Sequence, residues 1–425
     1  FLEKKPYLTL KEVEEFEDLV HTLTEEEKEA VNENIKNILY KANLPHLCET
    51  LCGLVKNAKQ WIGNDFLEYS RRPEWYSSRT SWGFAIQTLG ALFIAKAAPL
   101  CPEAKEEFDK IVRDMSKDQV HVQSAQDACP SSLFPNLQAY ALPLALVQNQ
   151  LPIDSPVIYG KQFYSLLLKD ILKKDGLLPH QKLYFQNLLE STHQSIDFDI
   201  QHAEEIFEKK GSGSIFNTYG LATSLITHPQ ERGFTLLKTT FNEDAPLNVQ
   251  YSPQKYQPKG SHRGSAARAV PVHLSLYQAE KEAPKKEMHK KNLLAALKNY
   301  EKNLPSLMAH LRRDMTHMGA DSLAPYYLYS SVPYATAATR LLLDKEVLTN
   351  EEREELLHVQ GELRTALLSL IEKEGLFESQ GGEFQHYSSS VGYVNPLGGL
   401  ALIPLAEECG KGGHFQPSTG ILNVE

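Results

Sequence analysis

The chain has 425 residues, of which 42% are hydrophobic and 23% charged, a composition typical of a globular protein with a sizeable core. Its net charge of −10 argues against a nucleic-acid-binding protein, which would present a basic face. No apolar run in the sequence approaches the roughly 20 residues that a membrane-spanning helix requires. This length is enough for two or three average domains, but repeat folds form longer single units.

The cysteines are too few and too unevenly placed for a disulfide scaffold. Cys101 and Cys129 each lie beside a proline and are expected to pair if the protein is exported. Cys48 and Cys52 are four residues apart on an expected helix, where we interpret both as small core residues. The sequence predicts no structural zinc site and no cofactor. The chain begins at Phe1 rather than Met, as it would after removal of a signal peptide or trimming of the start, and we expect a periplasmic or secreted protein.

In chain order, an N-terminal extension is expected over residues 1–20, followed by charged amphipathic segments that predict outer helices. Thr24 and Glu27 form a capping box at the start of the first of these. Thr349 and Glu352 repeat the motif, and Gly375 is expected to end that helix in a left-handed conformation. Three more outer helices, each charged on one face and apolar on the other, are predicted over residues 102–115, 179–209 and 284–313.

Six other segments are apolar on nearly all sides and recur along the chain. In each, Ala, Gly and Ser alternate with Tyr, Phe and Leu, as in a helix that is buried on every side. Several contain a proline, which predicts kinked helices. Because these segments alternate with polar ones, the pattern predicts inner helices surrounded by outer helices. Their starts are about 50 to 80 residues apart, near Ser78, Ser131, Ser214, Ser265, Ser322 and Ser389.

One segment interrupts the pattern, between His228 and His262. Residues 234–241 alternate weakly and are rich in strand-forming side chains, residues 242–246 resemble a turn, and residues 248–251 are a candidate return strand. We therefore predict a small β-hairpin or irregular insertion near residues 233–262, which is either a lid or binding loop or a disordered segment. Beyond residue 409 the sequence is typical of a poorly ordered tail.

These alternating segments resemble the (α/α)6 toroid, a superfamily that includes glycoside hydrolases, polysaccharide lyases and terpene cyclase/prenyltransferase-like proteins. The segments SLAPYYLYSSVPYATAATRLLL and SIFNTYGLATSLI carry most of the resemblance. It implies an all-α fold with a single toroid domain over residues 21–408, an insertion at 229–262 and a tail at 409–425. The triterpene-cyclase DxDD motif and the Cys/His ligands of a zinc prenyltransferase do not occur in the expected places, so the resemblance is architectural.

In such a toroid, the loops that precede the inner helices gather at one rim around a central cavity. The resemblance therefore brings together aromatic, amide, guanidinium, carboxylate and imidazole side chains from six separate loops. In chain order these candidates are Trp75, Tyr76, Arg79, His121, Gln126, Asp127, Asn217, Tyr219, His262, Arg263, Arg268, His317, Asp321, Tyr326, Tyr327, Glu383, His386 and Tyr387.

Two kinds of chemistry fit these candidates. A glycosidase needs two carboxylates beside the scissile bond, and Glu383 and Asp127 are the best pair, with Asp321 as a substitute. A polysaccharide lyase needs a base and a group that neutralises a uronate. Tyr387 or Tyr327 with His262 or His386 would supply the first, and Asn217 with Arg268 the second. Because Tyr, His and Arg outnumber carboxylates in these loops, the lyase-like set is slightly favoured.

Substrate binding is assigned to the remaining aromatic, amide and guanidinium groups, since sugars stack on aromatic rings and bond to Arg and Asn. These residues are Trp75, Tyr76, Arg79, Asn217, Tyr219, Arg263, Arg268, Tyr326 and Tyr327. The sequence thus predicts a carbohydrate-active toroid that is lyase-like or hydrolase-like on a polysaccharide or cell-wall glycan. The alternative is a non-catalytic toroid that binds a protein, peptide or isoprenoid lipid in its central cavity.

A separate pattern of His310, Asp314, His317 and Asp321 places four potential ligands on one helical face. Gly319 is expected to end that helix, and two arginines interleave with the acidic residues. We therefore interpret the pattern as a solvated polar face and predict no metal.

Overall fold

The computed structural model describes residues 46–59, 76–117, 155–212, 216–255, 262–310, 327–371, 376–377, 391–406 and 421–422, together with Thr22, Thr24 and Glu27. Within these residues the fold is all-helical, as predicted, and β-pairing is limited to isolated bridges. No helix in the described ranges combines the length and apolarity needed to cross a bilayer.

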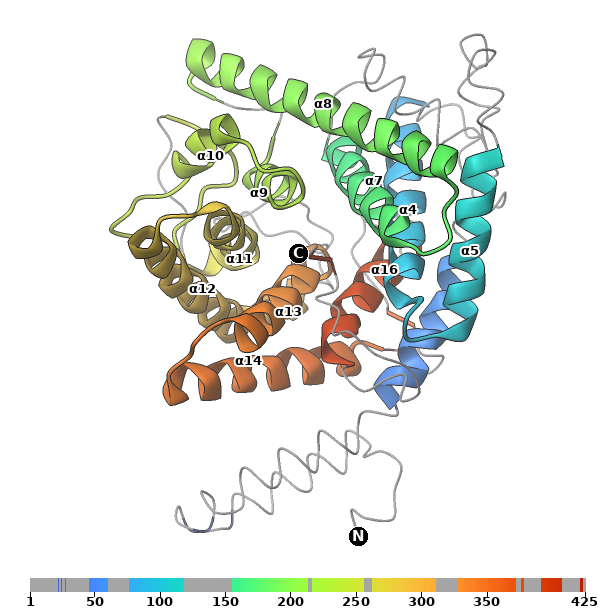
Figure 1. The fold of residues 1–425 in the computed structure, drawn as a ribbon. Helices are drawn as coiled ribbons and strands as arrows, with labels where there is room; N and C mark the ends of the chain where they lie inside the picture. The colour runs from blue at the N-terminus through green and yellow to red at the C-terminus, as the bar shows by residue number, and fades with distance from the viewer. Residues whose placement is uncertain are drawn as a thin grey trace.

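Six buried helices follow one another in a closed cycle of contacts, which we call the helix ring (Figure 1). Each member packs against the next, and the last packs against the first. In order of contact the ring consists of α4 (Tyr76–Ala97), α7 (Ser155–Lys173), α9 (Thr218–Thr227), α11 (His262–Ala279), α13 (Tyr327–Lys345) and α16 (Val391–Leu402). A short 3-10 turn, Ile403–Leu405, extends α16.

More polar helices pack outside the ring (Figure 1). Each contacts at least one ring helix, and α12 also packs on α14. The outer helices are α5 (Pro102–Lys117), α8 (Pro179–Lys210), α10 (Glu231–Lys238), α12 (Ala283–His310) and α14 (Asn350–Ser369). The prediction of outer helices at 102–115, 179–209 and 284–313 is therefore confirmed, with ends that shift by a few residues.

Both predicted capping boxes form. The backbone N–H of Thr24 donates to the carboxylate of Glu27, at 2.9 Å, and Glu27 N–H donates back to the Thr24 hydroxyl. Thr349 and Glu352 make the same reciprocal pair ahead of α14, at 2.8 and 3.1 Å. These caps satisfy amide hydrogens that have no partner within the first turn of a helix. Gly375, the predicted end of α14, lies outside the described residues; the helix itself ends at Ser369.

The strand predicted over residues 234–241 was wrong. Residues 231–238 form α10, and in the described part of the insertion β-pairing is limited to single bridges such as Asn242 with Ala245. Gly233, Leu236 and Leu237 are the buried residues of α10, a helical spacing that turns one face toward α8 and α9. The insertion is therefore irregular and partly helical rather than a hairpin.

Ring helix α7 was not among the predicted inner helices. It lies between α4 and α9 in the cycle, and α8 covers its outer side. The predicted inner segment near Ser131 lies outside the described residues. The other five predicted inner segments correspond to α4, α9, α11, α13 and α16.

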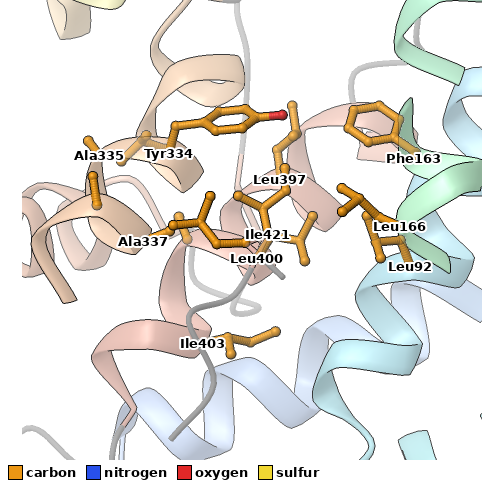
Figure 2. Packing of buried hydrophobic residues seen from close by; sticks show 14 of the residues in the cluster. Leu92, Phe163, Leu166, Tyr334, Ala335, Ala337, Leu397, Leu400, Ile403 and Ile421 are labelled. Carbon is orange, nitrogen blue, oxygen red and sulfur yellow. The ribbon is translucent and has the colours of Figure 1, made fainter. Parts of the chain in front are cut away.

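The centre of the ring is filled by aliphatic side chains (Figure 2). Leu92 of α4 and Leu166 of α7 lie on one side, and Ala337 of α13 and Leu400 of α16 lie on the other. Ile421 reaches the same cluster, although it belongs to a segment expected to be a poorly ordered tail. That expectation fails at residues 421–422, which are buried.

The cysteine prediction is also corrected. Cys52 and Cys101 form a disulfide that joins the helical residues 46–59 to the start of α5. Cys101 is therefore not paired with Cys129, and Cys52 is not a free core residue. Cys48 is disulfide-bonded as well. The sequence favoured Cys129 as the partner of Cys101 because both cysteines lie beside a proline. It did not show that the 46–59 helix lies next to the start of α5, where Cys52 can reach Cys101.

Candidate functional site

Most of the predicted site residues are in segments at or before the starts of ring helices. The structure gives backbone positions for Tyr76 and Arg79 at the start of α4, His262 and Arg263 at the start of α11, and Tyr327 at the start of α13. It gives side chains for Asn217, Tyr219 and Arg268. The remaining candidates lie outside the described residues, namely Trp75, His121, Gln126, Asp127, His317, Asp321, Tyr326, Glu383, His386 and Tyr387.

Hydrogen bonds tie the starts of three ring helices together, between the neighbours α7 and α9 and between α9 and α13. The Asn217 amide, which precedes α9, donates to the Tyr159 hydroxyl in the first turns of α7, at 3.1 Å. The Tyr219 hydroxyl donates to the backbone carbonyl of Ser330 in the first turn of α13. These contacts place the starts of α7, α9 and α13 at the same end of the ring.

Asn217 is the N-cap of α9. Its side-chain oxygen accepts a hydrogen bond from the N–H of Gly220 at 2.6 Å, which satisfies one of the unpaired amides of the first turn. A Cβ added at Gly220 would lie 3.1 Å from that oxygen, so glycine allows the cap to approach closely. Asn217 is buried and bonded to protein groups on both sides, which defines a structural role for it.

Arg268 is 2% exposed and lies on α11. Its Nη2 donates to the carbonyl of Val249 at 3.2 Å, and its guanidinium lies 5.9 Å from the ring centroid of Tyr251. Ser265 also holds Val249, by accepting from its N–H and donating to its carbonyl. Arg268 therefore fixes the segment that follows α10 against α11, and Thr218 N–H donates to the carbonyl of Tyr251 to link this segment to α9.

Buried tyrosines pack and form hydrogen bonds close to these helix starts. Tyr219 packs edge-on against Tyr159 and Tyr334, with centroid separations of 5.7 and 5.9 Å. The Tyr300 hydroxyl shares a hydrogen bond of 2.9 Å with Ser331. Burial raises the pKa of both Tyr300 and Tyr334 well above the usual value, so both phenols stay neutral and neither can act as a base near pH 7.

A cleft with a volume of about 390 Å³ opens elsewhere, between α8 and the end of α9. His193 of α8 stacks on His228, which follows α9, with ring centroids 4.1 Å apart. His228 Nε2 lies 2.6 Å from a carboxylate oxygen of Asp197. The cleft is lined by Gln186, Leu189, Glu190, His193, Gln194, Asp197 and His228.

The groups in this cleft do not form a catalytic triad. His193 Nε2 lies 2.8 Å from the Ser165 hydroxyl, but Ser165 is 0% exposed and cannot reach a substrate in the cleft. Asp197 bonds to His228 rather than to the histidine that contacts the serine. Burial, with the nearby charges of His228 and Lys169, lowers the pKa of His193 to about 3, which makes it a weak base. Among the described residues no cluster of His, Cys, Asp and Glu has an arrangement that would hold a metal.

Neither this cleft nor a buried ion pair between α7 and α8 was predicted from the sequence. Lys161 of α7 and Asp199 of α8 are 3% and 2% exposed, and their charged groups are in direct contact. The only local signal was the spacing of Glu190, His193 and Asp197 along one face of α8. The partners of these groups are on other helices, and a single sequence does not reveal such pairs.

Comparison with known proteins adds no assignment: no protein-family model, curated protein or solved structure matches the chain.

Proposed function

We propose that the chain is an (α/α)6 toroid. The closed cycle of contacts through α4, α7, α9, α11, α13 and α16 supports this architecture, with outer helices packed around it. The hydrogen bonds from Asn217 to Tyr159 and from Tyr219 to Ser330 support a common direction for α7, α9 and α13, as a toroid requires. The 46–59 helix, joined to α5 by the Cys52–Cys101 disulfide, is consistent with a further outer helix.

We infer that the protein works in an oxidising compartment, either the periplasm or the medium outside the cell. Disulfides persist in such compartments and are rare where glutathione and thioredoxin keep thiols reduced. The support is the Cys52–Cys101 bond, together with the disulfide-bonded state of Cys48.

We propose further that this toroid is carbohydrate-active at the rim where its ring helices begin. The observation that supports the proposal is that Asn217, Tyr219 and their partners join the starts of α7, α9 and α13. Loops that precede helices with adjoining starts would meet at one end of the ring. Aromatic and guanidinium side chains at such an end suit stacking on sugar rings and bonding to hydroxyls or uronates. Trp75, Tyr76, Arg79, Arg263, Tyr326 and Tyr327 are the proposed contacts.

Asn217, Tyr219 and Arg268 have a different place in this proposal. Each is buried and hydrogen-bonded to the protein, so we assign them to the scaffold that positions the rim rather than to direct contact with a glycan. For catalysis, Glu383 with Asp127 would serve hydrolysis, whereas Tyr387 with His262 and His386 would serve β-elimination.

The test is a thermal-shift screen of the full chain against neutral oligosaccharides, oligouronates and peptidoglycan fragments. A ligand that binds only the folded state raises the melting temperature by mass action. We expect a shift with one glycan class that is lost in His262→Ala or Glu383→Gln. Tyr219→Phe is the matched control, since it should lower the melting temperature through the lost hydrogen bond but keep the ligand-induced shift.

Product analysis then separates the two reactions. Elimination leaves an unsaturated uronate that absorbs in the ultraviolet, whereas hydrolysis releases a new reducing end without that chromophore. If no oligosaccharide or uronate changes the melting temperature, the carbohydrate proposal is wrong, and the non-catalytic toroid with a ligand in its centre is favoured.

A further inference from the structure

The centre of the helix ring holds a part of the chain that belongs to none of the ring helices. Ile421 is 0% exposed and Leu422 is 2% exposed, and both belong to the same buried cluster as the ring side chains. Figure 2 shows Ile421 beside Leu397 and Leu400 of α16, with Leu166 facing them from α7. In Figure 2 labelled side chains of four ring helices, α4, α7, α13 and α16, lie around Ile421, which is remote from three of these helices in sequence.

The surroundings of this pair are apolar. The labelled neighbours in Figure 2 are aliphatic or aromatic, and they include the small side chains of Ala335 and Ala337 on α13. Tyr334 contributes the polar atom among these labelled side chains, and its hydroxyl has protein partners in Thr223 and Tyr219. The centre therefore suits a branched aliphatic side chain and disfavours a charged one.

The ring closes without this pair. Ring helix α16 packs directly on both α4 and α13, so the cycle of contacts is complete through the helices themselves. Residues 407–420 link the pair to the end of the ring, and a linker of that length spans up to about 50 Å when extended. Residues 421–422 are thus buried in a helix ring whose cycle of helix-to-helix contacts does not include them.

We propose that the centre of the helix ring is a binding site for a peptide that presents two adjacent aliphatic side chains, and that residues 421–422 occupy it in cis and can exchange with a peptide in trans. The inference does not depend on the carbohydrate proposal, which concerns the helix starts. It commits to a peptide as the occupant, because the occupant in the structure is a peptide segment of this chain.

The experiment uses the full chain and a fluorescently labelled peptide of residues 413–425, followed by fluorescence anisotropy. The wild-type chain should not bind the peptide, because its own residues fill the site. The full chain with Ile421→Asp and Leu422→Asp should release its segment, since burying two carboxylates is unfavourable, and should then bind the wild-type peptide.

Specificity is tested with three peptides. A peptide with Ile421→Asp and Leu422→Asp should bind at least about 100-fold more weakly, whereas a peptide with Ser418→Asp and Thr419→Asp, which has the same added charge, should bind as the wild-type peptide does. Ile421→Ala in the peptide should weaken binding by roughly 30-fold, the effect expected for emptying a buried aliphatic site.

A second preparation guards against misfolding of the substituted chain. A protease site inserted after Gly412 of the otherwise wild-type chain allows the segment to be cut after folding, and the labelled peptide should then exchange into the cut protein. The proposal is overturned if the cut protein takes up no labelled peptide, or if cutting unfolds the helices as measured by circular dichroism. Binding of a fluorescent fatty acid without binding of the peptide would also overturn it, by identifying a lipid site.

Discussion

Replacing Lys161 by Met should lower the free energy of unfolding by about 3 to 5 kcal/mol, because it leaves the carboxylate of Asp199 buried without its counter-ion. The two residues join ring helix α7 to outer helix α8 and are 3% and 2% exposed. Asp199 Oδ1, the carboxylate oxygen that does not contact Lys161, has no hydrogen-bond partner among the described residues. The pair is therefore incompletely satisfied even in the wild type.

Because Asp199 Oδ1 has no hydrogen-bond partner in the described part of the chain, removing both charges together should cost little stability. Lys161→Met with Asp199→Leu removes both charges and the unsatisfied oxygen, so its stability should return to within about 1 kcal/mol of the wild type or exceed it. The matched control is Lys298→Met, which breaks the exposed pair of Lys298 with Glu355 between α12 and α14. That change should alter stability by less than about 1 kcal/mol.

The pH dependence of the Lys161→Met defect has a defined sign. Burial raises the pKa of Asp199, and the attraction of Lys161 opposes the rise. Without Lys161, the pKa in the folded state rises further above the unfolded value near 4. Between the two values the folded state holds more protons, so stability increases as pH falls through the folded pKa. The deficit of Lys161→Met relative to wild type should thus shrink between pH 7 and pH 5.

Denaturant unfolding followed by far-ultraviolet circular dichroism, with the disulfides intact, measures these differences. Values at pH 7 and pH 5 for the wild type, Lys161→Met, the double variant and Lys298→Met complete the set. A loss below about 1 kcal/mol for Lys161→Met, or a double variant that is less stable than Lys161→Met, would refute the reasoning.

Three further predictions concern stability. Cys52→Ala with Cys101→Ala opens a link across 49 residues and should reduce stability by about 4 kcal/mol on the chain-entropy account, and an unchanged melting temperature would contradict it. Gly398→Ala places a Cβ against the ring of Phe377 and should destabilise by about 1 to 3 kcal/mol, whereas Gly361→Ala on α14 meets no atom within 4 Å and should stabilise by about 0.5 to 1 kcal/mol; equal effects in denaturant unfolding would refute the contrast. In the folded protein the pKa of His193 is lowered to about 3, so the stability that the neutral imidazole contributes is present above pH 6.5 and is lost as pH falls toward 3. In a titration of melting temperature against pH, His193→Gln should therefore give a shallower fall on the acid side, and an unaltered slope would count against this prediction.

The sequence predicted those elements whose signals are local. The capping boxes at Thr24 and Thr349 depend on residues three positions apart, and both form. The amphipathic periods of α5, α8 and α12 gave their ranges to within a few residues, because each helix has one face in contact with the ring and one in solvent.

The errors arise where tertiary contacts decide. Residues 234–241 have strand-forming side chains, yet Leu236 and Leu237 are buried on one face of a helix, between α8 and α9. Gly233 permits this packing, because a Cβ there would lie 2.5 Å from Leu225. A close approach of two helices thus overrides a weak local propensity.

Ring helix α7 was not predicted, because its sequence is less uniformly apolar than those of the predicted inner helices. Lys161 and Lys169 interrupt its apolar sequence, but both ammonium groups are bonded inside the protein, to Asp199 and to the carbonyl of Thr227. Charged residues identify a surface only when they have no buried partner. The same limitation hid the stack of His193 on His228, whose members are brought together only by the packing of α8 against the end of α9.

Polar contacts at both ends of α7 set its position in the ring. Near the helix starts, Asn217 bonds to Tyr159, and near the helix ends, Lys169 bonds to the carbonyl of Thr227 at 2.8 Å. Lys96 of α4 forms an ion pair with Asp170 of α7 at 3.2 Å, also near the ends. Apolar faces rich in small residues would allow helices to slide past one another, whereas each of these contacts specifies one register.

The consequence for function lies at the helix starts. A ligand that moved the start of α9 away from α7 or α13 would have to break the Asn217–Tyr159 or the Tyr219–Ser330 hydrogen bond. Both bonds are in a buried setting, where an unsatisfied polar group is costly. We therefore expect the proposed rim site to bind its ligand with these helix starts already in place, and selectivity to reside in the side chains that the preceding loops supply.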